Sequence, residues 1–191
     1  MRTSDALARA LLQRLRGLNR VERAVVFRAS VIGRRFRLAV LSGTTAIPEH
    51  KVRAALDKAC DLQLLTAETT DGDWYAFRHA LTRDIAYDEF VETRVRPVHR
   101  RIARVLERCT HDDRAASVGH EALDALAYHS WAAGDAARSI RYNEMAGDRA
   151  AAAFADDDAH TYYTRAREFA SDASAPYRRL TNKLSALRRE D

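Results

Sequence analysis

The chain has 191 residues, of which 47% are hydrophobic and 31% are charged, and its formal net charge is +5. This length can bury one or two hydrophobic cores. No apolar run approaches the roughly 18 residues that a membrane span needs, and residues 1–18 lack the apolar core of a signal peptide, so we expect a cytoplasmic protein.

The charge is distributed unevenly along the chain. Residues 1–60 hold 13 lysines and arginines against 4 acidic residues, whereas residues 61–91 hold 2 against 7. Residues 92–109 are again basic, with 6 against 2, and residues 110–191 are mildly acidic, with 11 against 14. A basic front of this kind can meet either DNA phosphates or an acidic partner surface, and charge alone does not distinguish the two.

Four helices are expected in the first 60 residues. The first is capped by Ser4 or Asp5 and ends near Gly17, because apolar residues recur at helical spacing between these points. The second runs from about Asn19 to Gly33, and a short third helix covers residues 36–41. The fourth begins at Pro48, since proline is tolerated in the first turn of a helix.

The sequence then changes from helical to alternating texture. Residues 62–66 form a short apolar run, residues 74–77 form an aromatic one, and Asp71-Gly72 lies between them. Two such runs about an Asp-Gly turn predict a β-hairpin. A helix follows from His79 to about Phe90, and a second, strongly basic helix follows Thr93 with one buried apolar stripe and one cationic face.

The remainder is predicted to be helical and repetitive. Helices are expected over residues 121–133, 136–153 and 156–170, and a last one opens at Pro176. The segments LAYHSWAAGD, IRYNEMAGDRA and DDAHTYYTRARE place small residues where paired helices approach closely and aromatic residues between them. This pattern is similar to tetratricopeptide repeats, of which two are visible where three or more are usual.

The segment FRHALTRDIAYDEFVETRVRPVHRRIARVLE carries a resemblance to a known family. An aromatic strand end, His-Ala-Leu, Arg-Asp-x-Ala-Tyr and then His-Arg-Arg-Ile-Ala-x-x-Leu-Glu resemble the region after the nucleotide-binding domain of STAND-type signalling ATPases. These include LuxR-family, MalT-like transcriptional regulators and multidomain adenylate and guanylate cyclases. LNRVERAVVFRASVIGRRF is similar to the opening helix of the same region, and DLQLL to the strand that begins its wing.

The resemblance implies a mainly α fold with three parts. Residues 1–18 would form a lead-in helix, residues 19–110 a winged-helix domain with a small β-hairpin, and residues 118–191 a tetratricopeptide-like helical arm. In the family this winged helix is an interdomain switch. The expected function is therefore a non-catalytic interaction and relay module that couples a nucleotide switch to a ligand-binding or protein-binding arm in signal transduction or transcription regulation.

Several chemistries have no motif in this chain. No GxxxxGK[ST] loop occurs, and neither a helix-turn-helix output domain nor the paired aspartates of a cyclase is recognisable, so we expect neither an enzyme nor a bound cofactor. ATP or ADP would act only through an ATPase domain in cis or in trans. Cys60 and Cys109 lack zinc or disulfide spacing, and we expect both to be reduced core thiols. Other expected partners are a signalling protein, a small-molecule inducer or a second copy of the chain.

Three groups of residues are candidates for function. By resemblance, His79 points at nucleotide phosphates on an ATPase domain; the alternative is that it caps the strand-to-helix junction. Arg34, Arg35 and Arg37 are candidates for phosphate contact in a free-standing winged-helix DNA-binding regulator, although the third helix lacks side chains that read bases. Candidates for the ligand face of the arm, or alternatively for its core, are Tyr128, Trp131, Tyr142 and Tyr162.

The remaining histidines and acidic clusters are expected to be structural. His99 lies beside the apolar stripe of the basic helix and is expected to pack there. His120 and His129 lie on opposed sides of one helix and make no metal motif. The aspartates at 156–158 are expected to cap a helix and to oppose its dipole, rather than to hold a metal.

Overall fold

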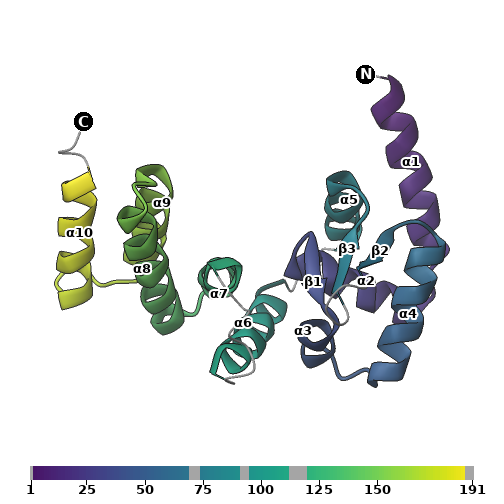
Figure 1. The fold of residues 1–191 in the computed structure, drawn as a ribbon, viewed down its shortest axis with the longest axis horizontal. Helices are drawn as coiled ribbons and strands as arrows, with labels where there is room; N and C mark the ends of the chain where they lie inside the picture. The colour runs from purple at the N-terminus through teal and green to yellow at the C-terminus, as the bar shows by residue number, and fades with distance from the viewer. Residues whose placement is uncertain (1, 69–73, 91–94, 112–119, 188–191) are drawn as a thin grey trace. The chain divides into compact units, whose positions relative to one another are not determined.

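The computed structural model describes residues 2–68, 74–90, 95–111 and 120–187. Within these ranges the chain is mainly helical, with ten helices and a three-stranded antiparallel sheet (Figure 1). The chain divides into two compact units, Met1–Val98 and His99–Asp191. Each unit is described by itself.

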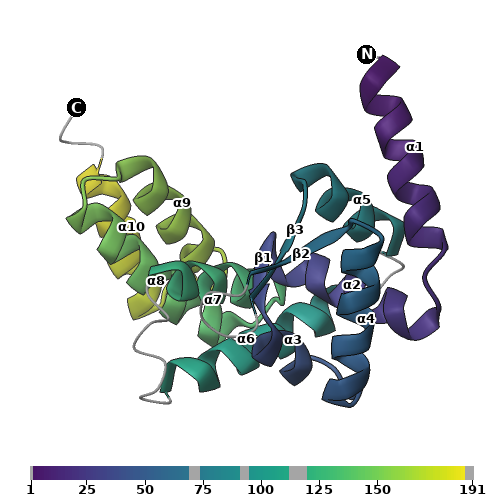
Figure 2. The same ribbon diagram turned by 45° about the vertical axis from the view of Figure 1, so that its right-hand side comes forward.

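The first unit combines helices with the sheet. Its helix α1 ends before a short link, and the N-terminal half of α1 extends beyond the rest of the unit in both ribbon views (Figures 1 and 2). The elements are, in chain order, α1 (Arg2–Arg16), α2 (Arg20–Ile32), β1 (Arg35–Arg37), α3 (Leu38–Gly43), α4 (Glu49–Asp61), β2 (Leu65–Glu68), β3 (Trp74–Phe77) and α5 (Ala80–Phe90).

Local sequence explains where α2 begins and ends. The Asn19 side chain accepts hydrogen bonds from the backbone N–H groups of Val21 and Glu22, at 2.8 and 3.0 Å, and the Glu22 carboxylate accepts one from the Asn19 N–H at 2.7 Å. This reciprocal capping satisfies donors that the first turn of a helix leaves free. The helix stops at Gly33, whose φ of 153° is rarely adopted by other residues.

The sheet has the strand order β1-β3-β2, with both pairings antiparallel. The predicted pairing of the two runs that flank Asp71-Gly72 is confirmed, whereas that dipeptide lies outside the described residues. The inner face of the sheet is aromatic: Phe36 stacks with Tyr75 at a ring-centroid distance of 6.1 Å and packs against Phe77 at 6.2 Å. These rings join the core formed by α1, α2 and α4.

Two sequence predictions in this unit were wrong. The predicted helix over residues 36–41 instead begins at Leu38, because residues 35–37 pair with β3 as a third strand. Strand pairing opposite Tyr75 places Phe36 inside the core, where it is 1% exposed. The predicted cap at Ser4 or Asp5 is also wrong, since α1 already includes both residues.

The second unit is an array of helices, into which α6 runs from the first unit. Its helix α8 packs against both neighbours, α7 and α9, and α10 packs against α9 (Figure 2). The predicted order of helices is confirmed. The predicted domain boundary, at residues 110–118, begins at the end of α6, whereas the two compact units divide near the start of α6, between Val98 and His99. The helices are α6 (Val95–His111), α7 (His120–Ala132), α8 (Ala136–Ala152), α9 (Asp156–Arg167) and α10 (Ala175–Leu187).

Small residues let α8 and α9 approach closely. Gly147 on α8 faces the ring of Tyr163 on α9 so tightly that an added Cβ would lie 2.5 Å from the ring. Tyr163 is only 3% exposed. Ala150 of α8 and Ala159 and Ala166 of α9 add small residues to this core, as the sequence pattern predicted. Helix α10 contributes Leu180 and Leu184.

The predicted amphipathic pattern of α6 is also confirmed. Ile102, Ala103, Val105 and Leu106 are buried, whereas the arginines of the same helix at positions 100, 101, 104 and 108 are exposed. The helix therefore turns one apolar stripe inward and one basic face toward solvent.

Candidate functional site

His79 lies at the junction between β3 and α5. Its backbone carbonyl accepts hydrogen bonds from the N–H groups of Thr82, at 3.0 Å, and Arg83, at 3.4 Å, and so begins the helix. The side chain is exposed, and its ring makes no hydrogen bond within the described ranges. The backbone of His79 therefore has a structural role, while its imidazole is accessible to a partner.

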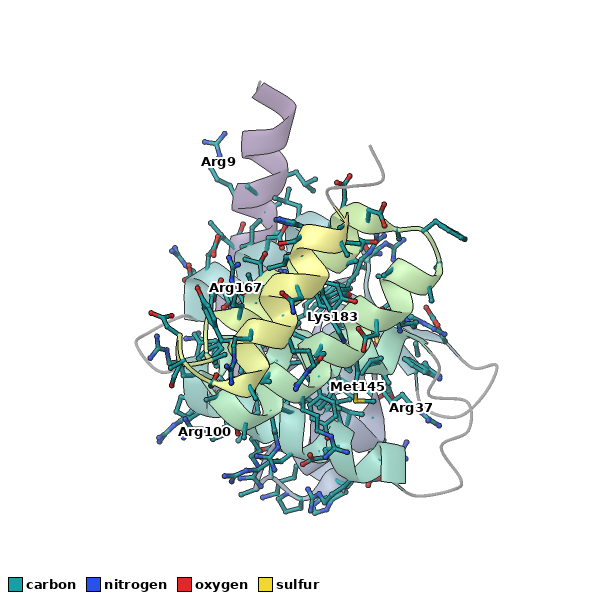
Figure 3. All side chains as sticks on the ribbon, turned by 90° about the vertical axis from the view of Figure 1, so that its left-hand side faces the viewer. Arg9, Arg37, Arg100, Met145, Arg167 and Lys183 are labelled. Atoms are coloured by element: carbon teal, nitrogen blue, oxygen red, sulfur yellow. The ribbon has the colours of Figure 1, made fainter. Side chains whose placement is uncertain are left out.

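The three candidate arginines lie at or before β1. Arg35 pairs with Glu68 of β2 at 2.7 Å, and its guanidinium lies 4.1 Å from the centroid of the Trp74 ring. The Arg37 guanidinium lies 5.5 Å from the same ring, and Arg34 is exposed just before the strand. The strand register places Arg35, Arg37, Trp74 and Glu68 on the solvent face of the sheet. Arg37 is labelled in Figure 3.

The four aromatic candidates of the helical arm separate into two classes. Tyr142 is buried, and its hydroxyl donates to Glu107 of α6 at 2.5 Å. Tyr162 donates to Asp124 of α7 at 2.6 Å. These two tyrosines join helices to one another, whereas Tyr128 and Trp131 lie together on α7, with ring centroids 6.2 Å apart.

Two residues of the α9 segment complete a cluster around Trp131. The indole N–H donates to the Glu168 carboxylate at 2.6 Å. The Arg165 guanidinium lies 4.9 Å from the centroid of the Trp131 ring and 5.9 Å from that of Tyr128. We call Tyr128, Trp131, Arg165 and Glu168 the aromatic cluster. Its rings and guanidinium are half-buried, which gives it both an apolar body and a polar rim.

A buried histidine pair lies behind the aromatic cluster. His99 of α6 and His129 of α7 are 3% and 1% exposed, and their Nδ1 atoms are 2.7 Å apart. At this distance one Nδ1 is protonated and donates a hydrogen bond to the other Nδ1, which accepts it. The Tyr128 ring contacts both imidazoles edge-on, at centroid distances of 5.6 and 5.3 Å. A continuous row of rings thus connects the buried histidine pair, through Tyr128, to Trp131.

Carboxylates fix the helices that carry these rings. Burial by itself raises the pKa of Glu107, but hydrogen bonds from Tyr142 and Arg138 outweigh burial and lower that pKa below its usual value. Burial, followed by the bond to Glu107, raises the pKa of Tyr142 to about 12. Burial and the bond to Asp124 do the same for Tyr162, whose pKa is also raised to about 12.

A second set of ion pairs joins α10 to α8. Glu144 accepts from Arg179 at 2.6 Å and pairs with Lys183 at 2.9 Å, and Lys183 is labelled in Figure 3. Hydrogen bonding by Arg179 is the main cause that lowers the pKa of the Glu144 carboxyl. Asp148, one turn further along α8, accepts hydrogen bonds from both Tyr163 and Lys183.

The structure adds residues that the sequence analysis did not select. Arg165, Glu168 and Glu107 were missed because their roles depend on contacts between helices far apart in the chain. The expected packing of His99 is confirmed by its burial, but its pairing with His129 had no sequence signal. In the described parts of the chain, no group of three or more His, Cys, Asp or Glu residues could hold a metal ion.

Two further observations bear on function. Comparison of the chain with known protein families, curated proteins and solved structures gave no match. Of the helices that the structure describes, none has both the length and the apolar character needed to cross a membrane.

Proposed function

We propose that the chain is a non-catalytic interaction and relay module of a STAND-type signalling ATPase, with the ATPase domain in the same polypeptide or in a separate protein. The first unit would act as a winged-helix switch that docks on the ATPase domain. The helical arm would bind a signalling protein or a small inducer. The observation that carries the proposal is the aromatic cluster on the arm, because Trp, Tyr and Arg dominate the binding energy of protein interfaces.

The order of elements supports the switch assignment. Helix α2, strand β1, helices α3 and α4 and the β2–β3 hairpin follow one another as in a winged-helix domain. His79 directly follows the hairpin with its ring exposed, which suits contact with a nucleotide held by another domain.

The arm supports the second half of the proposal. Its helices meet through small residues, as in tetratricopeptide arrays. In such arrays the stacked helices form an extended concave surface that binds partners. Tyr142 and Tyr162 have carboxylate partners within the second unit, whereas the indole and guanidinium of the aromatic cluster remain partly open to solvent.

A DNA-binding regulator is the second candidate, favoured by Arg34, Arg35 and Arg37 at the sheet. In the observed order the helix that precedes the β2–β3 pair is α4, so α4 rather than the predicted third helix would enter the major groove, and its charges oppose DNA binding. On this helix Glu49, Asp57 and Asp61 balance the basic residues, and Glu49 pairs with Arg53 at 3.1 Å. A groove-reading helix needs a net positive surface toward phosphates. Salt-dependent binding of the chain to duplex DNA at physiological ionic strength would favour this candidate.

Nucleotide-dependent crosslinking tests the proposed function. A photoreactive amino acid at position 78, which is exposed and leaves His79 in place, should crosslink, in lysate from the source cells, to a polypeptide that contains a P-loop. The yield should differ between added ATP and ADP. In the unlabelled chain, His79→Ala should remove this nucleotide dependence in co-purification. His50→Ala, which removes another exposed histidine of the same unit, should preserve it. Equal capture with ATP and ADP, or no P-loop protein, would contradict the proposal.

A further inference from the structure

We propose that the aromatic cluster is a docking site for an aspartate or glutamate side chain in a short acidic peptide segment of a partner protein. This inference rests on the proposed function of the arm and specifies the chemistry of its partner. Arg165 would receive the carboxylate, and the rings of Tyr128 and Trp131 would contact the apolar part of the segment.

Arg165 is held in place by the two rings. Its guanidinium lies over both Trp131 and Tyr128, so that cation–π attraction limits its motion. A guanidinium carries five N–H donors in a planar fork, and stacking on a ring leaves the edges of that fork available. Ordering a long side chain in advance reduces the entropy lost when a ligand binds.

Within the described residues, the N–H groups of Arg165 form neither a hydrogen bond nor an ion pair. Two other arginines of the arm differ in this respect: Arg138 pairs with Glu107 at 2.9 Å, and Arg179 pairs with Glu144 at 2.6 Å. The carboxylate three residues beyond Arg165 belongs to Glu168, and it accepts the indole N–H of Trp131 instead. Among the described residues, this preorganised cation therefore has no anionic partner.

Carboxylate is the anion that the surroundings favour. Arginine binds carboxylate through two parallel hydrogen bonds, which suits a single acidic side chain. A nucleic acid would instead bring a row of phosphates, which needs several cations, whereas the aromatic cluster offers the single guanidinium of Arg165. The half-buried rings on either side add apolar contact area that a peptide can cover.

Peptide selection tests this chemistry and does not require the partner protein itself. A phage library of random heptapeptides is panned against the immobilised full chain, and selected peptides are compared with those from empty matrix. We expect enrichment of peptides that contain Asp or Glu beside an apolar residue. A selected peptide is then titrated into a Trp74→Phe background, in which Trp131 is the only tryptophan and its fluorescence reports binding.

Charge-changing variants make the test specific. Arg165→Ala should weaken the selected peptide by roughly 10- to 100-fold, the usual range for losing a charge-assisted pair. Arg165→Lys should retain part of the affinity, and Arg165→Glu should select basic peptides instead. The matched control is Arg141→Glu on α8, whose guanidinium lies over the Tyr142 ring at 5.2 Å, and this variant should still select acidic peptides. Circular dichroism and thermal unfolding verify that each variant is folded.

The outcomes separate this inference from the proposed function. Selected peptides without carboxylates, or acidic peptides that bind Arg165→Glu as well as the unmodified chain, would overturn the acidic-peptide inference while leaving an interaction module. Recovery of no peptide above the empty matrix would also overturn it. Binding of single-stranded or duplex DNA that depends on Arg165 would replace the peptide with a nucleic acid. Failure of the crosslinking at position 78 would bear on the relay function alone.

Discussion

Gly147→Ala should destabilise the helical unit, although alanine is the better helix former. An added Cβ at this position would lie 2.5 Å from Cε1 and 2.6 Å from Cδ1 of Tyr163. The ring cannot withdraw easily, because it is 3% exposed and its hydroxyl donates to Asp148 at 2.7 Å. Overpacking of this kind costs about 1–3 kcal/mol, and the helix propensity of alanine recovers up to about 1 kcal/mol. With the full recovery, we therefore expect a net loss of up to about 2 kcal/mol.

Urea unfolding measures this loss directly. In a Trp74→Phe background the fluorescence of Trp131 follows the helical unit, and the midpoint should fall without a change in slope. In thermal unfolding the loss corresponds to a fall in Tm of roughly 4–8 °C per kcal/mol for a unit of this size. The matched control is the same substitution in a Tyr163→Leu background, where the contact is absent and alanine should be neutral or stabilising. An increase in stability from Gly147→Ala alone would refute the packing argument.

Three further predictions concern strain and titration. Phe154 has a φ of 57° and is 88% exposed. Because asparagine tolerates this left-handed backbone better than phenylalanine, Phe154→Asn should raise the free energy of unfolding measured in urea by about 0.5–1 kcal/mol. A loss of stability would show that the ring has an unrecognised contact. The pKa values of Glu107 and Glu144 are lowered on folding. Their contribution to the free energy of unfolding is therefore present above the unfolded pKa of about 4.3 and is lost as pH falls through the folded pKa values. Glu144→Gln should make the acid limb of a stability–pH curve shallower, and an unchanged limb would contradict this. The pKa values of Tyr142 and Tyr162 are raised to about 12. Their contribution to the free energy of unfolding is therefore present below the unfolded pKa of about 10 and is lost between about pH 10 and about pH 12. Tyrosinate absorbance should rise late in this window, and Tyr142→Phe should remove part of that late rise.

Periodicity predicted most of the fold because each helix carries its own apolar stripe. The limits of α2 follow from Asn19 and Gly33, and the buried face of α6 follows from its apolar spacing. The short strand β1 was missed because three residues are too few to show an alternating pattern, and because Phe36 and the residues after it also fit a helix. Only pairing with β3 determines that residues 35–37 are extended.

The candidate sites were harder to predict than the fold. Aromatic spacing selected Tyr128 and Trp131, which do lie together, but it also selected Tyr142, whose hydroxyl is bound to a carboxylate on another helix. The difference depends on which helix packs on which face, and a linear pattern does not contain that information. Arg165 was missed for the same reason, since its stacking on two rings of α7 arises only when α7 and α9 are side by side.

The tyrosine–carboxylate bonds of the arm have a consequence for its evolution and engineering. Repeat arrays usually tolerate duplication, deletion or exchange of a unit, because each junction is equivalent to the next. Here three junctions each have their own pairing: Glu107 receives Tyr142, Asp124 receives Tyr162, and Asp148 receives Tyr163. Removing or exchanging one helix pair would leave the hydroxyl of a buried or half-buried tyrosine without its acceptor. The helices of this arm are therefore expected to be inherited and transplanted only as a block.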